Sequence, residues 1–123
     1  MKYVEIAQDG NCLFNSISYA IAYDYRHGKK LRKFAVDHVK NNIDKYKDYI
    51  FKNVDTYLKN MYQEGEYGDE IMLNAISEIL SIKITVYDKY NHKIISVYDN
   101  SNNNKNKKIL IFFMINIYYI MIV

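Results

Sequence analysis

The chain has 123 residues, enough for one compact domain, and its half apolar and one quarter charged composition is ordinary for a globular protein. Its net charge of +3 comes from lysines scattered over several segments, so a nucleic-acid-binding surface is not indicated. A single cysteine excludes an internal disulfide and favours a reducing, cytoplasmic location. We expect a monomer, and the short stretch before Glu5 does not resemble a signal peptide.

The first two thirds of the chain show helical spacing of apolar residues after a short extended segment over residues 3–7. Five helices are predicted, over residues 12–25, 30–42, about 44–50, 56–63 and 70–80. Asp44, Asp55 and Asp69 are placed to cap the last three. Ile21 and Phe34 belong to the apolar stripes that we expect to face the core.

Beyond residue 81 the apolar period changes to two, which indicates strands. We predict strands over residues 82–87 and 93–98, then a polar loop over 99–108 and a buried central strand over 109–113. Helices followed by a late, mainly antiparallel small sheet predict an α+β domain with helices flanking the sheet.

The C-terminal segment from Ile109 to Val123 is an atypical apolar tail without Gly, Asp or Pro. Its 15 residues fall short of the ~20 that cross a bilayer, although a peripheral membrane contact is one alternative. Two strands joined by a tight bend at residues 114–116 are the favoured interpretation. The outer strand would then be an exposed apolar edge unless another strand covers it.

The hexapeptide from Asp9 to Phe14 places the only cysteine, Cys12, between a turn and a helix. A thiol at a helix N-terminus lies among unpaired N–H groups at the positive end of the dipole, which favours the thiolate. The same N–H groups can hold the oxyanion of an acyl-transfer intermediate. The alternative is that Cys12 is a small buried hydrophobic residue, the commoner role of a lone cysteine.

The same hexapeptide, Asp-Gly-Asn-Cys-Leu-Phe, resembles the signature of the ovarian tumour (OTU) family of cysteine deubiquitinases. Later segments also resemble family motifs in the expected order, over about residues 8–113 of a single OTU-like domain spanning 1–123. These segments are Leu31-Arg32, Gly65-Glu66-Tyr67-Gly68-Asp69 and Ile84-Thr85-Val86-Tyr87. Tyr67 stands where the family usually has tryptophan.

The resemblance implies a papain-like thiol protease fold that hydrolyses the isopeptide bond between the C-terminus of ubiquitin and a lysine. Cys12 would be the nucleophile, and Asp9 would support an oxyanion hole made by the backbone N–H groups of Asn11 and Cys12. The active-site wall would include Gly10, Tyr67 and Gly68. The implied partners are ubiquitin or a ubiquitin-like modifier and ubiquitinated proteins, without a cofactor.

Each of these assignments has a structural alternative. Asp9 can simply bond its own turn, Gly10 can serve only its backbone angle, and Tyr67 can be core packing. A metal site is not indicated, because one cysteine and three dispersed histidines lack the paired spacing of zinc ligands.

Thiol hydrolysis needs a base, almost always histidine, and the family places it after the last core strand in an Asn-His-aromatic context. Here Asn116-Ile117-Tyr118 occupies that place, so Ile117 stands where the histidine is expected. His27 would lie too far along the first helix, His38 shares a helical face with apolar residues, and His92 falls in a turn. We therefore expect lost or impaired hydrolysis.

Two further interpretations stay open at this point. The chain can be a ubiquitin-binding or scaffolding module that kept the fold after losing catalysis. It can also be a truncated version of a longer protein that has the histidine.

Overall fold

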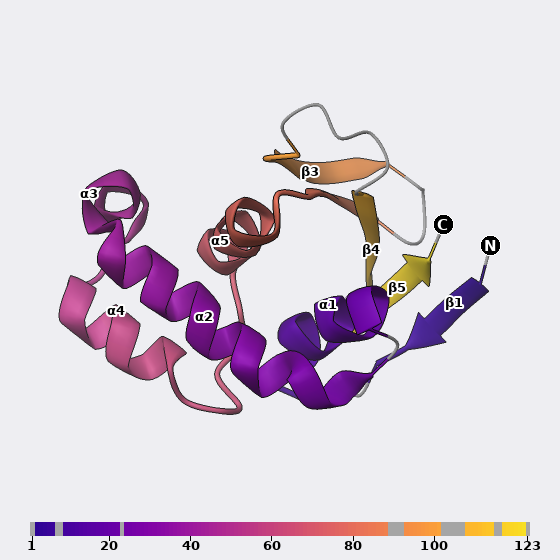
Figure 1. The fold of residues 1–123 in the computed structure, drawn as a ribbon, viewed down its shortest axis with the longest axis horizontal. Coiled ribbons are helices and arrows are strands. Elements are labelled where there is room, and N and C mark those ends of the chain that lie inside the picture. The colour runs from indigo at the N-terminus through magenta and orange to yellow at the C-terminus, as the bar shows by residue number, and fades with distance from the viewer. Residues whose placement is uncertain are drawn as a thin grey trace.

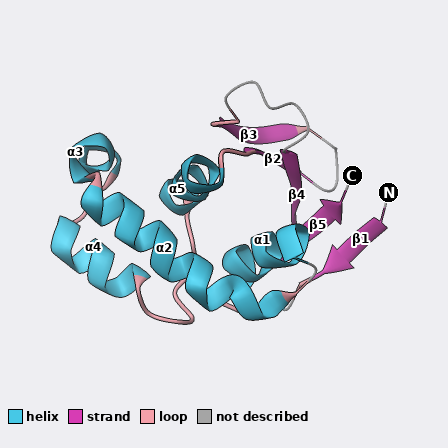
Figure 2. Cartoon of the chain, in the orientation of Figure 1, coloured by secondary structure: helices cyan, strands magenta, loops and turns pink. Residues whose placement is uncertain are grey.

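The computed structural model describes residues 2–6, 9–22, 24–88, 93–101, 108–114 and 117–122, and gives only the backbone for residues 2–5, 25, 108–114 and 117–122. Helices gather on one side of the molecule and strands on the other (Figures 1 and 2). The helices are α1 (Cys12–Ala22), α2 (Gly28–Asn41), α3 (Ile43–Tyr46), α4 (Val54–Met61) and α5 (Glu70–Leu80), with short 3-10 helices η1 (Tyr25–His27) and η2 (Lys47–Tyr49).

The strands form one five-stranded sheet in the order β1-β5-β4-β2-β3. Their bounds are β1 (Lys2–Glu5), β2 (Lys83–Asp88), β3 (Ile94–Asp99), β4 (Lys108–Met114) and β5 (Ile117–Ile122). Only the β2–β4 pair is parallel, and the other three pairs are antiparallel. The predicted α+β class with a mainly antiparallel sheet is therefore confirmed.

The apolar C-terminal tail supplies the middle of this sheet. β4 is its central strand, as predicted, and β5 pairs on its other side with β1, where Lys2 lies opposite Ile122. β1 thus covers β5, the outer strand of the tail, so β5 is not an exposed edge of the sheet. No helix in the described parts of the chain has the length and apolar character needed to cross a membrane.

The core lies between α1, α2, α5 and β2. α1 packs against β5 and α2, while α2 packs against α5. Fully buried side chains from these elements include Leu13, Phe14, Ile17, Val36, Val39, Met72, Ile76 and Ile84.

Two helices differ from prediction in extent or facing. α1 ends at Ala22, because the chain then forms η1 and starts α2 at Gly28, so Ile21 in its last turn is exposed. Phe34, which was predicted to face inward, is also exposed, because the buried face of α2 includes Arg32 and Val36 and is turned away from Phe34.

The capping predictions give a mixed result. Asp69 caps α5 as predicted, accepting a hydrogen bond from the Met72 N–H at 3.0 Å. Asp55 does not cap α4, because Asn53 accepts the bond from Thr56 N–H at 3.0 Å. Asp44 lies in the first turn of α3, two residues after the N-cap position, which Asn42 occupies.

Replacing Asp69 with alanine should lower the free energy of unfolding by about 1–2 kcal/mol, because the cap of α5 and the acceptor of the Tyr57 hydroxyl (2.8 Å) are both lost. Asp69→Asn keeps a capping oxygen and should cost well under ~1 kcal/mol. Urea denaturation of the two variants checks this, and equal losses would contradict the capping role.

Candidate functional site

Cys12 is the first residue of α1, and the preceding turn closes on itself through Asp9. The Asp9 carboxylate accepts a hydrogen bond from the Asn11 N–H at 2.9 Å, and the Asp9 backbone carbonyl accepts one from the Cys12 N–H at 3.1 Å. The two N–H groups predicted to form an oxyanion hole are therefore both engaged within the turn. A bound oxyanion would have to replace Asp9 as their acceptor.

The thiol of Cys12 is buried, with 1% of the residue exposed, in a small cluster with Ile6, Tyr19 and Ala20. Burial raises the pKa of this thiol to about 11, against the opposing effect of the Leu13 N–H, while the nearby Asp9 charge raises the pKa further. The helix N-terminus was predicted to favour the thiolate by lowering the thiol pKa. This prediction is wrong, because desolvation raises the pKa by more than the N–H groups at the helix N-terminus lower it. The neutral thiol is the ground state at pH 7.

Arg32 is the central polar contact of this region, although only 2% of the residue is exposed. Its guanidinium donates to the Gly10 carbonyl (3.0 Å), the Glu66 carbonyl (2.8 Å) and the Asn11 side-chain oxygen (3.0 Å). It also donates to the Met61 carbonyl at 3.0 Å. One side chain from α2 thus holds the cysteine turn, the end of α4 and the segment that follows α4.

Asn11 and two glycines bring the cysteine turn directly against that segment. The Asn11 side-chain oxygen also accepts a hydrogen bond from the Gly65 N–H at 2.8 Å. A Cβ atom on Gly10 would lie 1.5 Å from the Gly65 carbonyl oxygen, so the two backbones touch. Among the four glycines only Gly65 has a positive φ, 88°, which means that Gly10 is needed for close approach and not for an unusual backbone angle.

The predicted wall residues Tyr67 and Gly68 follow in the same segment. Gly68 packs on the first turn of α1, where an added Cβ would meet Leu13 and Phe14 side-chain atoms at 3.1–3.3 Å. Tyr67 is 53% exposed, so the alternative of core packing does not apply to it. Gly68 therefore lies against the helix that carries Cys12, and Tyr67 precedes it in the chain.

The described histidines have other partners. His38 Nε2 lies 3.1 Å from a carboxylate oxygen of Glu78, and His27 is exposed near Asp24 at 3.9 Å. Because α1 ends at Ala22, the straight-helix argument against His27 does not hold, but no described hydrogen bond joins it to Cys12. His92 lies outside the described residues. No group of three or more metal-ligating side chains occurs in the part that the structure describes.

Ile117 opens β5, where its backbone is paired opposite Met114 of β4. β5 is the strand against which α1 packs. The residue at the position of the expected histidine therefore begins the strand that packs against the Cys12 helix.

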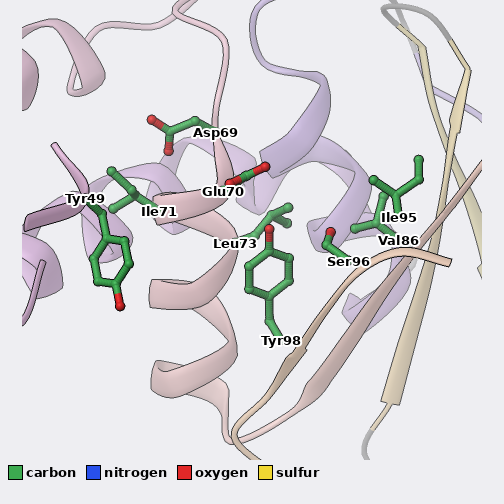
Figure 3. A pocket seen from close by; sticks show the side chains of 9 residues that line it. All are labelled: Tyr49, Asp69, Glu70, Ile71, Leu73, Val86, Ile95, Ser96 and Tyr98. Atoms are coloured by element: carbon green, nitrogen blue, oxygen red, sulfur yellow. The ribbon is translucent and has the colours of Figure 1, made fainter. Parts of the chain in front are cut away.

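A groove that the sequence did not predict lies between α5, η2 and the β2–β3 hairpin (Figure 3). Its volume is about 470 Å³, and it begins at Asp69 and Glu70, directly after Gly68. Tyr98 reaches from β3 toward α5 across the groove (Figure 3). The lining residues are Tyr49, Asp69, Glu70, Ile71, Leu73, Val86, Ile95, Ser96 and Tyr98.

A β-bulge shapes the strand side of this groove. Val86 pairs with Ser96 and Tyr87 pairs with Ile94, so Ile95 is an extra residue on β3. The bulge brings both Ile95 and Ser96 to the lining, although neighbours on a regular strand face opposite sides. The adjacent isoleucines, Ile94 and Ile95, break the alternation of apolar and polar residues along the strand. This break is the one signal in the sequence that could have indicated the bulge.

A helix that starts at a buried cysteine and packs on a mainly antiparallel sheet is an arrangement that fits a papain-like α+β fold. A family model described as OTU-like cysteine protease matches residues 7–121, and the chain belongs to this OTU family.

Curated relatives and solved structures agree with the assignment. The chain is 29% identical over 87 residues to the OVARIAN TUMOR DOMAIN-containing deubiquitinating enzyme 10 of Arabidopsis thaliana, covering 71% of this chain and 24% of that protein. It is 24% identical over 115 residues to the OTU domain-containing protein 5 of Rattus norvegicus, covering 94% of this chain and 20% of that protein. The chain thus spans a quarter or less of either relative.

Among solved structures, an ovarian tumour domain in complex with ubiquitin superposes with a TM-score of 0.79 at 27% identity, covering 96% of this chain and 68% of that chain. This similarity agrees with the papain-like fold expected from the sequence.

Alkylation of Cys12 by iodoacetamide should be slow at pH 7–8 and should accelerate up to pH values near the thiol pKa of about 11. The physical reason is that only the thiolate reacts, and burial keeps the thiol protonated. Mass spectrometry of the folded chain over this pH range measures the rate, with Cys12→Ser as the unreactive control. A rate that levels off below pH 8 would contradict the raised pKa.

Proposed function

We propose that this chain is a deubiquitinase domain by descent that binds ubiquitin but hydrolyses its isopeptide bonds slowly or not at all. The observation that carries the proposal is the isoleucine at position 117, at the start of the strand beside the Cys12 helix. A fully inactive ubiquitin-binding or scaffolding module is the limiting case of this proposal, in which the residual rate of hydrolysis is zero.

The chemistry explains why one residue has this effect. Cys12 would attack the isopeptide carbonyl carbon, the carbonyl oxygen would become an oxyanion held by the Asn11 and Cys12 N–H groups with Asp9 as support, and the lysine amine would leave with a proton. A base must first take the thiol proton and then give it to the amine. Isoleucine can do neither, and losing a triad base costs ~10⁴- to 10⁶-fold in rate.

The raised thiol pKa makes the missing base more important. A cysteine with a pKa of about 11 is almost wholly protonated at pH 7, so little thiolate is present without a partner. The engaged N–H groups of the turn add a second barrier, because they have to leave Asp9 before they can stabilise an oxyanion.

Ubiquitin binding does not need the missing base. The groove in Figure 3 combines an apolar floor that includes Leu73 and Ile95 with the carboxylates of Asp69 and Glu70. An extended segment with apolar and basic side chains would fit it. Because the groove begins one residue after Gly68, which packs on the Cys12 helix, a segment bound there would lead to the cysteine turn. We assign this groove to ubiquitin.

Labelling with a ubiquitin probe that has a thiol-reactive propargyl group at its C-terminus tests the missing base. The natural chain should label negligibly, and Ile117→His should raise the labelling rate by about 10²- to 10⁴-fold, the contribution of a general base. Gel-shift assays over time measure both rates. Ile117→His combined with Cys12→Ser is the control and should not label, whereas rapid labelling of the natural chain would refute the proposal.

Two adjacent isoleucines on β3 offer a matched test of the groove. Ile95 lines the groove and is 53% exposed, whereas Ile94 is 58% exposed and does not line it. Ile95→Asp should weaken ubiquitin binding by about 5- to 30-fold, the effect of losing a contact worth ~1–2 kcal/mol, while Ile94→Asp should change it less than about twofold. Isothermal titration calorimetry with monomeric ubiquitin measures both, and equal effects would place ubiquitin elsewhere.

A further inference from the structure

The buried guanidinium of Arg32 has no described carboxylate within ion-pair distance, and the four oxygens that accept its hydrogen bonds are uncharged, as is the Met61 sulfur at 4.0 Å. Three are backbone carbonyls and one is the Asn11 side-chain oxygen. The Phe14 ring lies under it, with its centroid 4.3 Å from the guanidinium carbon. Burial lowers the pKa of Arg32, opposed by the more distant charges of Glu64 and Glu66. The charge is therefore tolerated only while the four acceptors surround it.

These acceptors lie next to the residues assigned to the reaction. Gly10 and Asn11 immediately precede Cys12, and Glu66 immediately precedes Tyr67. The Asn11 oxygen that accepts from Arg32 also accepts from the Gly65 N–H. Arg32 and Asn11 therefore join the cysteine turn to the segment from Gly65 to Gly68 from two directions.

We propose that Arg32 is a positioning residue which, with the Asn11 side chain, clasps the cysteine turn against the Gly65–Gly68 segment and so sets both the burial of the thiol and the opening through which ubiquitin reaches it. The clasp comprises the hydrogen bonds of these two side chains to Gly10, Gly65 and Glu66 and to each other. This proposal rests on the proposed function, because it takes Cys12 to be the reacting residue.

A clasp predicts a different result from a purely stabilising role of Arg32 and Asn11. When it opens, the thiol becomes more accessible to small molecules, but the turn and the wall lose their mutual alignment for a protein substrate. Small-molecule alkylation and ubiquitin-directed labelling should therefore change in opposite directions.

The first arm of the test measures Cys12 alkylation by iodoacetamide in the full chain without ubiquitin. Arg32→Met should accelerate alkylation roughly tenfold, because the rate follows the population of opened turn. Arg32→Lys keeps the charge but cannot reach all four acceptors, and should give an intermediate rate. If Arg32→Met does not fold, Arg32→Lys decides the result alone.

Val36→Ala is the matched control, because Val36 is fully buried on α2 one turn after Arg32 and is not one of the groups that Arg32 bonds. It should lower the melting temperature without accelerating alkylation beyond what the lower stability explains. Asn11→Ala should accelerate alkylation like Arg32→Met, and the double variant should be no faster than the faster single variant, since both open one clasp. Unchanged alkylation in Arg32→Lys and Asn11→Ala, or additive effects, would overturn the proposal.

The second arm repeats the Arg32 substitutions in the Ile117→His background with the ubiquitin probe. Labelling should fall roughly tenfold in Arg32→Met and be partly recovered in Arg32→Lys, while alkylation rises. Labelling that rises together with alkylation would overturn the positioning role. If Ile117→His itself does not label, the proposed function has failed, and the alkylation arm still decides whether Arg32 and Asn11 form a clasp.

Discussion

The arrangement of the site depends on one buried cation. Arg32 projects from the inward face of α2, where its guanidinium has exchanged water for carbonyl and amide oxygens at 2.8–3.0 Å. A charge in such a place is stable only when its donors are used, so the fold has to bring residues 10, 11, 61 and 66 to the same point. The cysteine turn, the end of α4 and the wall of the site are therefore fixed by one side chain.

The reactivity of Cys12 is decided by the balance of two local effects. Its place at a helix N-terminus favours the thiolate, but burial beside Ile6, Tyr19 and Ala20 removes the thiol from water and shifts its pKa the other way. A thiol of this kind reacts only if a neighbouring group takes its proton. This makes the residue at position 117 decisive for the proposed function, because an isoleucine side chain cannot accept the proton of a thiol whose pKa is raised.

Recognition and chemistry occupy separate parts of the proposed site. The groove is built by α5, η2 and the bulged hairpin, whereas the proposed nucleophile, Cys12, lies at the start of α1, and Ile117, the position proposed for the missing base, lies at the start of β5. Losing the base changes none of the groove residues. A domain of this construction can lose turnover and keep its binding surface, which is the physical basis for proposing a ubiquitin-binding protein with little or no hydrolysis.

The sequence by itself determined what depends on neighbouring residues: α5 runs from Glu70 to Leu80 with Asp69 as its cap, as predicted, and the signature around Cys12 identified the family. Only the tertiary structure decided the burial of Cys12, the inward place of Arg32 in preference to Phe34, and the pairing of β1 with β5. The reason is that a cap or a turn is stabilised within a few residues, whereas burial, hydrogen-bond partners and strand neighbours come from segments distant in the chain. Arg32 could be read in the sequence as part of a family motif, but its four acceptors could not.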